Sequence, residues 1–245
     1  MIRIGEHPSP NFGERAPGKP VDMIVLHYTG LPSAAAALNW LSDPRSEVSS
    51  HYLVFEDGGI LRLVDEGHRA WHAGKSFWAG EIDINSRSIG IEIANPGHEY
   101  GYRAFPEPQI AAVVALCRDI VVRHPVPPER VLAHSDVAPF RKDDPGELFP
   151  WDLLHSAGVG NWVPPEPITK GPFLQLGERG RPVEALRNAL RAYGYDLAEG
   201  DEFDAALVTI VRAFQRHFRP VLIDGVADAS TVATLERLAV QLRRK

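Results

Sequence analysis

The chain has little cysteine, and this limits the chemistry it can support. Cys117 is the only cysteine among 245 residues, so an internal disulfide and a zinc site built from several cysteines are both excluded. It lies on the apolar side of a helical pattern, which predicts a core position. A nucleophilic cysteine needs an accessible, electropositive setting instead. Cys117 is therefore expected to be structural.

The chain also lacks an excess of basic residues and any long apolar run. Lys and Arg number 26 against 32 Asp and Glu, a formal net charge of -6, and this balance argues against nucleic acid as a partner. No stretch approaches the roughly 20 apolar residues of a transmembrane helix. The first 20 residues contain no apolar core of a secretion signal. We therefore expect that the protein is made without a standard signal or has lost one.

The patterns that are present predict two domains of different class. Residues 1–160 mix strand and helix patterns, which predicts an α/β fold with a mixed central sheet flanked by helices, preceded by an extended lead-in over 1–20. Residues 161–172 are rich in proline and are predicted to form a stiff linker. Residues 173–245 contain three helical patterns, which predict a smaller all-α domain.

Apolar periodicity and capping residues place the main elements. The predicted strands are an apolar run at 23–26, the two arms of a hairpin around Asp57-Gly58-Gly59, residues 88–95 and residues 131–133. The predicted helices begin after Ser33, at Pro108, at Pro182, after Asp204 and after Asp228. The segment after residue 133 is expected to be an irregular loop.

Two histidines stand at the ends of predicted buried strands. His27 follows one strand and His134 follows another, so their side chains lie side by side if the strands are neighbours. Asp144 can supply an oxygen if the loop after His134 folds back. Two histidines and a carboxylate, with a fourth position left for water, form the ligand set of a catalytic zinc. Either histidine alone is more simply an ordinary buried residue, but the combination favours a metal site.

Two charged residues are candidates for the chemistry beside that metal. Glu92 interrupts the strand 88–95 on the face opposite its isoleucines. It either points to solvent or serves as a general base toward a water, with its pKa raised by partial burial. Lys142 either is an exposed loop lysine or stabilises the carbonyl oxygen of a tetrahedral intermediate.

Substrate contacts are predicted for a further group of residues. The run RAWHAGKSFW offers an aromatic and polar rim suited to a sugar or peptide, although Trp71 serves equally well in packing. His51 is interpreted as a residue lining the cleft and not as a ligand. The predicted contacts are Tyr28, His51, Trp71, His72 and Asn95.

Five runs, in order between Val21 and Trp151, resemble a known family. They are IVLHYTG, VSSHYLVFEDGGI, RAWHAG, SIGIEIAN and HSDVAPFRKDDPGELFPW. Together they resemble the zinc-dependent N-acetylmuramoyl-L-alanine amidases related to peptidoglycan recognition proteins (amidase type 2). The similarity is greatest to the AmiD-like members, which carry a C-terminal peptidoglycan-binding domain. The C-terminal runs resemble that domain too, although LRNAL stands where a glutamine is usual in the first helix.

This resemblance implies a reaction and roles for five residues. It implies that His27, His134 and Asp144 hold one zinc ion per chain, that Glu92 is the base and that Lys142 stabilises the oxyanion. The implied reaction hydrolyses the amide between N-acetylmuramic acid, or its 1,6-anhydro form, and L-alanine in cell-wall turnover. Peptidoglycan or muropeptide fragments are then the expected partners, and a monomer is expected. A wall-binding tail favours the periplasm or cell envelope, whereas the absent signal favours the cytoplasm.

Two other functions remain open from the sequence. One is a peptidoglycan-recognition module without catalysis, although such proteins usually lack one or more of the zinc ligands that are complete here. The other is a zinc peptidase that cuts within the stem peptide, which the ligands alone do not exclude.

Overall fold

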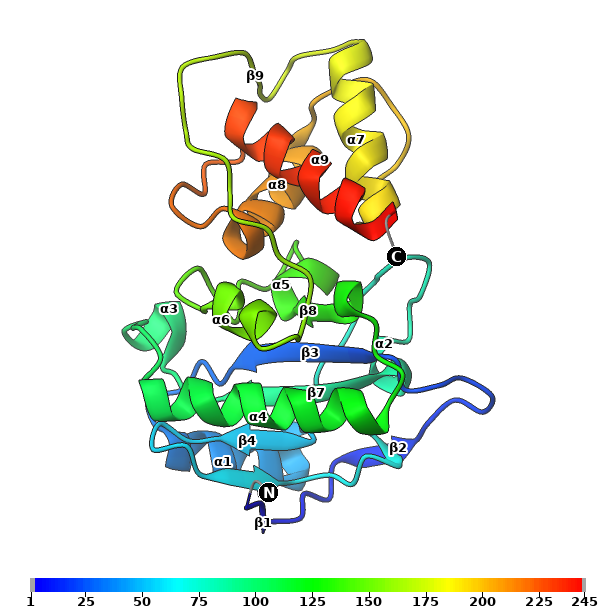
Figure 1. Cartoon of the computed structure of the whole chain (residues 1–245). Coiled ribbons are helices and arrows are strands. Elements are labelled where there is room, and N and C mark those ends of the chain that lie inside the picture. Colours follow the sequence, from blue (N-terminus) through cyan, green and yellow to red (C-terminus); the bar gives the residue numbers. More distant parts are fainter. Residues whose placement is uncertain (1–2, 244–245) are drawn as a thin grey trace.

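A six-stranded mixed sheet forms the centre of the N-terminal part (Figure 1) of the computed structural model, which describes residues 3–243. Its strands, in spatial order, are β1 (Gly5–Glu6), β5 (Ile60–Arg62), β4 (Tyr52–Val54), β7 (Ser88–Ile93), β3 (Met23–Tyr28) and β8 (Val131–Ala133). β4, β7, β3 and β8 are parallel, while β5 runs antiparallel to β4 in the predicted hairpin. The predicted mixed α/β class is confirmed.

Successive side chains of a strand point to opposite faces of the sheet. Apolar side chains on both faces are covered by helices. Ile24 and Leu26 of β3 pack in a cluster with α4 (Glu107–Arg123), to which Cys117, fully buried, also belongs. On the opposite face, Leu53 packs with α1 (Ala34–Ser42). The predicted cap of α1 is confirmed, since the Ser33 side chain accepts a hydrogen bond from the Ala36 amide.

Several short elements surround the sheet. They are β2 (Phe12–Glu14) and β6 (His68–Ala70), which pair with each other, α2 (Ile84–Arg87), α3 (Gly97–Tyr100), α5 (His134–Val137) and α6 (Trp151–Ser156), with 3-10 turns at Pro44–Ser46 and Pro128–Arg130. The prediction of an irregular loop from His134 is wrong at its start, where α5 forms. A single turn is too short to show a helical period, and the Asp136 carboxylate closes it by accepting from the Ala133 amide.

The C-terminal part contains the three predicted helices, α7 (Arg181–Tyr193), α8 (Ala205–Phe218) and α9 (Ala229–Arg243), with the short pair β9 (Phe173–Leu174) and β10 (Ala227–Asp228). The Asp204 cap is confirmed by a 2.8 Å hydrogen bond from the Leu207 amide. The Asp228 cap is confirmed by one of 2.8 Å from Thr231. The domain bounds at 160 and 172 stay a prediction.

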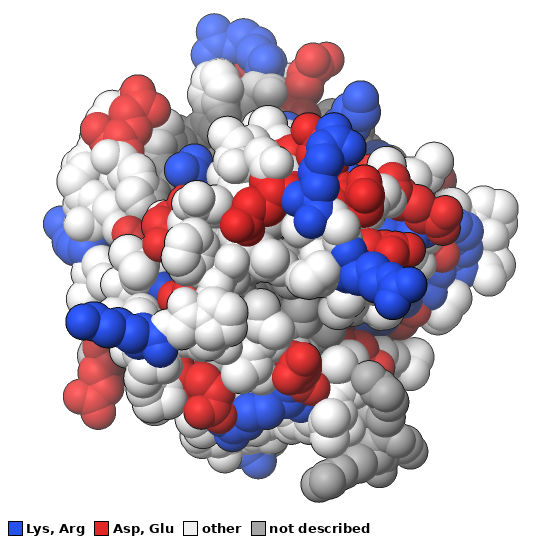
Figure 2. Space-filling model, turned by 90° about the horizontal axis from the view of Figure 1, so that it is seen from above, with Lys and Arg blue, Asp and Glu red and all other residues white. Residues whose placement is uncertain are grey.

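Charge on the face that carries the C-terminal helices is mixed. Figure 2 shows acidic and basic side chains interspersed over this face, so it presents no extended field of one sign. A polyanion would therefore gain little electrostatic attraction here.

Among residues 3–243, no helix combines the length and apolar character needed to cross a membrane.

A buried polar network joins the two parts of the protein. The Asp136 carboxylate, with its side chain fully buried, accepts from the Tyr195 hydroxyl at 2.8 Å and lies 2.7 Å from His217 Nδ1. The His217 ring stacks on Trp151 with centroids 3.7 Å apart. Since a buried carboxylate is costly without partners, α8 and the residues after α7 complete the environment of α5. The proline-rich segment therefore connects two parts that touch directly.

Replacing His217 with leucine is expected to destabilise the whole protein. The change keeps apolar bulk but removes a partner of a buried carboxylate, so we expect a loss of about 2–4 kcal/mol in the free energy of unfolding. Chemical denaturation measures it. Glu199→Gln is the control, because its side chain is 83% exposed in a surface ion pair with Arg191 and should change stability by less than about 0.5 kcal/mol. Equal stabilities for the two variants would contradict the role of the network.

A second network gives stability a defined pH dependence. The Glu66 carboxylate binds the Tyr52 hydroxyl at 2.7 Å and contacts Arg123 and His124 at the end of α4. Burial acts to raise its pKa, but the hydrogen bonds from Arg123, His124 and Tyr52 outweigh it and lower the pKa from 4.5 to about 2.

Because the pKa of Glu66 is lower in the folded than in the unfolded protein, the ionised carboxylate stabilises the fold. This stabilisation is complete above the pKa of the unfolded state and is lost as the pH falls through the pKa of the folded state. We therefore expect the wild type to exceed Glu66→Gln in stability by on the order of 2 kcal/mol at pH 7. The difference should shrink between pH 4.5 and about 2. Denaturation of both proteins across that range checks it, and a difference that stays constant would refute the assignment.

Candidate active site

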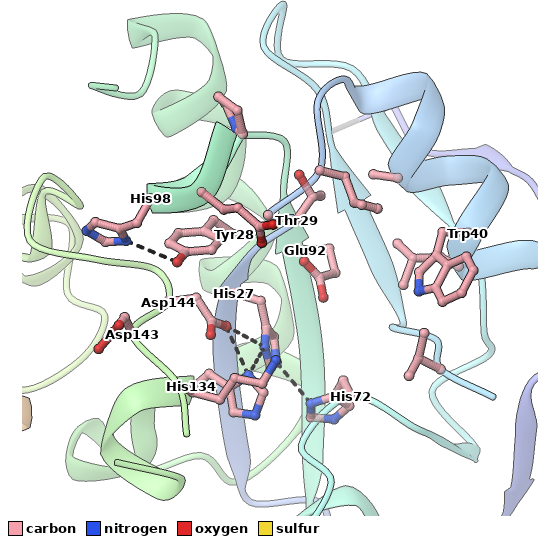
Figure 3. A pocket seen from close by; sticks show the side chains of 18 of the residues that line it. His27, Tyr28, Thr29, Trp40, His72, Glu92, His98, His134, Asp143 and Asp144 are labelled. Atoms are coloured by element: carbon pink, nitrogen blue, oxygen red, sulfur yellow. Dashed lines mark hydrogen bonds and ion pairs between the residues drawn. The ribbon is translucent and has the colours of Figure 1, made fainter. Parts of the chain in front are cut away.

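Three side chains meet where two neighbouring strands end. β3 and β8 pair in register, with Leu26 opposite Ala133, so the next residues, His27 near the end of β3 and His134 directly after β8, lie side by side. Their Nδ1 atoms are 2.8 Å apart, and Asp144 Oδ2 lies 3.0 Å from each (Figure 3). All three residues are buried. The structure thus brings together the three predicted ligands from positions up to 117 residues apart.

Backbone contacts set the direction of two of these side chains. The Ser135 amide donates to the Asp144 carbonyl at 3.0 Å and so folds the loop back onto α5. His134 Nε2 lies 3.2 Å from the Ala73 carbonyl and 3.4 Å from Arg141 Nη2, which also donates to that carbonyl. Donation from Nε2 to the carbonyl leaves the lone pair on Nδ1, on the side of Asp144.

The donor set fits a zinc ion. Zinc takes imidazole nitrogen and carboxylate oxygen at about 2.0–2.2 Å in a tetrahedron, which places neighbouring ligand atoms roughly 3.3 Å apart. The separations of 2.8–3.0 Å are within about 0.5 Å of that value. Two nitrogens and one oxygen would supply three positions, and a fourth would be left for a solvent molecule from the cavity that these residues line.

Burial and mutual interactions favour the metal-binding protonation states of His27 and Asp144. Burial, followed by the neighbouring His134, lowers the pKa of His27 to about 4, so its ring is neutral near pH 7. Burial acts to raise the pKa of Asp144, yet the two imidazoles outweigh it and hold that pKa below its ordinary value. A neutral imidazole and an ionised carboxylate are the forms that ligate.

Glu92 stands beside this group on the neighbouring strand. It pairs in register with His27 across β7 and β3, and its side chain points toward the same space (Figure 3). Its Oε2 atom is buried and has no hydrogen-bond partner within residues 3–243. Burial raises the pKa of Glu92 well above its ordinary value, and the Asp144 charge raises it further. An unpartnered carboxyl with a raised pKa is suited to accept and return a proton.

A cavity of about 370 Å³ opens over these residues. Lys142 is exposed at its wall, and its charge acts to lower the pKa of Glu92. Three predicted substrate contacts also line it, namely Tyr28, Trp71 and His72.

Two other predicted contacts lie away from the cavity. His51 is fully buried, where its Nδ1 accepts from the Gly90 amide at 2.9 Å and its Nε2 lies 2.9 Å from Arg15. Asn95, 3% exposed, donates to the Arg103 carbonyl at 2.7 Å. The structure does not bring either side chain to the cavity.

The sequence patterns missed two aromatic residues of the rim. Trp40 of α1 lines the cavity and is 50% exposed; its signal was a large aromatic residue outside the buried stripe of an amphipathic helix. His98 Nδ1 lies 3.1 Å from the Tyr28 hydroxyl (Figure 3). The other ring nitrogen of His98 is 3.1 Å from Glu147. No signal in the sequence predicted this position of His98, because its partners come from distant segments.

Comparison with known proteins identifies relatives for both parts of the chain. The family described as N-acetylmuramoyl-L-alanine amidase matches residues 17–147, and a putative peptidoglycan binding domain matches 179–235. The N-acetylmuramoyl-L-alanine amidase AmiD of Escherichia coli (strain K12) is 39% identical over 233 residues, covering 89% of this chain and 82% of that protein.

Two solved structures are similar over nearly the whole chain. One is E. coli AmiD in complex with the substrate anhydro-N-acetylmuramic acid-L-Ala-D-gamma-Glu-L-Lys, with a TM-score of 0.77 and 35% identity, covering 94% of this chain and 98% of that one. The other is AmpDh3 from Pseudomonas aeruginosa in complex with anhydromuramic pentapeptide, with a TM-score of 0.74 and 31% identity, covering 96% and 98%.

Proposed function

The chain belongs to the N-acetylmuramoyl-L-alanine amidase family, and we propose that it hydrolyses the amide between the lactyl carbonyl of N-acetylmuramic acid and L-alanine of the stem peptide. The sugar is taken in its ordinary or 1,6-anhydro form, during turnover and recycling of the cell wall. One observation carries the proposal: His27, His134 and Asp144 converge beside the unpartnered carboxyl of Glu92 at one cavity.

Each residue has a role that follows from its surroundings. Zinc held by His27, His134 and Asp144 would supply a Lewis acid for the carbonyl and acidify a water to a pKa of about 7. Glu92 takes a proton from the attacking water and delivers it to the amide nitrogen as the carbon–nitrogen bond breaks. Lys142, at the cavity wall, stabilises the negative charge that develops on the carbonyl oxygen.

The C-terminal helices suit a wall-binding role in the same chain. We propose the catalytic domain at 1–160, the linker at 161–172 and the peptidoglycan-binding domain at 173–245, with peptidoglycan and its fragments as partners. A wall-binding domain fits the periplasm or cell envelope, and the cytoplasm is the alternative that a recycling role allows. The protein is proposed to act as a monomer.

Digestion of defined muropeptides tests this function. Mass spectrometry should find muramic acid with a free lactyl carboxylate and an intact stem peptide that begins with a free L-alanine amine. Shortened peptides, with alanine still on the sugar, would instead identify a peptidase. Binding without cleavage by the zinc-loaded protein would identify a recognition module.

A further inference from the structure

His27 has a second ring nitrogen, and its partner is another histidine. Nδ1 of His27 faces His134 and Asp144, whereas its Nε2 lies 3.1 Å from Nδ1 of His72. The other nitrogen of His72, Nε2, lies 3.1 Å from the Ser88 hydroxyl oxygen. Both nitrogens of His72 are thus engaged within the protein, and the residue is 8% exposed.

The position of each proton in this series of hydrogen bonds follows from the hydroxyl group of Ser88. The Ser88 hydroxyl lies 2.6 Å from the Ile84 carbonyl, which only accepts, so its single proton is donated there. The Ser88 oxygen must then accept from His72, which places the His72 proton on Nε2. A neutral imidazole has one N–H, so Nδ1 of His72 is an acceptor and His27 must donate to it from Nε2.

We propose that His72 is a positioning residue that holds His27 in the tautomer protonated on Nε2, leaving the lone pair of Nδ1 for the metal. The proposal rests on the zinc site proposed above and adds a residue to it. A metal-bound histidine usually donates its other N–H to a carboxylate, a carbonyl or water. Here an imidazole takes that place, and its own tautomer is fixed by Ser88 and the Ile84 carbonyl.

The position of the His72 ring is fixed by contacts with two segments, at Gly90 and at Asn85. A Cβ atom at Gly90 in β7 would lie 2.4 Å from Cγ of His72, so only glycine leaves room for the ring. The amides of His72 and Ala73 both donate to Oδ1 of Asn85, at 3.2 and 2.8 Å. These contacts hold the ring beside His27.

Two variants at one position separate the acceptor from the bulk of the ring. The leucine of His72→Leu occupies the space of the ring but accepts no hydrogen bond, whereas His72→Asn offers an oxygen at the same δ position. We expect zinc affinity, measured by chelator competition at pH 7, to fall about 10–100-fold in His72→Leu. In His72→Asn it should stay within about threefold of the wild type. His155→Leu is the control, since that ring contacts the Gly160 carbonyl and not His27.

A second readout needs neither zinc nor activity. Long-range ¹⁵N–¹H spectra of the metal-free protein should show the His27 proton on Nε2 in the wild type and a mixture of tautomers in His72→Leu. If His72→Leu does not fold, Ser88→Ala tests the same series of hydrogen bonds by removing the partner of His72 Nε2. This variant should also produce mixed tautomers and weaker zinc binding. Unchanged tautomer and zinc affinity in a folded variant of either kind would overturn the proposal. A wild-type protein that binds no zinc would contradict the proposed function instead.

Discussion

Glu92→Gln is expected to lower turnover of a muropeptide by about 10²–10⁴-fold while zinc stays bound. Glutamine has nearly the same shape, so the cavity and the strand pairing with β3 are retained. It does not take up or return a proton, however, and the amide nitrogen is then a poor leaving group. Because Glu92 is none of the three converging ligands, its loss should leave metal affinity nearly unchanged.

Parallel measurements of turnover and zinc content make that result interpretable. The same exchange at Glu107, an exposed carboxylate in the first turn of α4, is the control and should leave both quantities near wild type. Full activity in Glu92→Gln would refute its role as the base. Loss of zinc from this variant would show that its carboxylate acts on the metal and not on the proton.

Asp144→Ala is expected to remove the metal itself. The change deletes the only anionic ligand and leaves two neutral imidazoles, so zinc affinity should fall by at least about 1,000-fold, with activity lost in step. Metal analysis after dialysis, followed by chelator competition, measures the change.

The adjacent residue supplies a matched control for that loss. Asp143 is exposed and pairs with Arg216 at 2.7 Å, so Asp143→Ala should keep its zinc. An Asp144→Ala protein that retains one zinc per chain would contradict the assignment of Asp144 as a ligand.

The parts of this site that the sequence predicted are those with a strong local signal. An apolar run ending in histidine places His27 and His134 at strand ends, and the alternation around Glu92 places it on the face opposite the isoleucines. The two histidines come together only because β3 and β8 are neighbours in the sheet. This pairing joins distant segments, so the local patterns did not predict it.

What the sequence did not predict depends on contacts between distant segments. His72 was expected at the rim for substrate, yet its ring nitrogens meet His27 and Ser88, and no spacing rule links these positions. The contacts of Tyr195 and His217 with Asp136 are equally non-local. A proline-rich segment predicted a linker but carried no information on whether the parts it joins would touch.

Anomalous diffraction at the zinc absorption edge, from crystals of the zinc-loaded protein, tests the metal site most directly. We expect one strong peak per chain, about 2.0–2.2 Å from Nδ1 of His27, Nδ1 of His134 and an Asp144 oxygen. The fourth position should open toward the cavity beside Glu92. A peak elsewhere, a fourth protein ligand that closes the site, or no peak at full zinc supply would contradict this account.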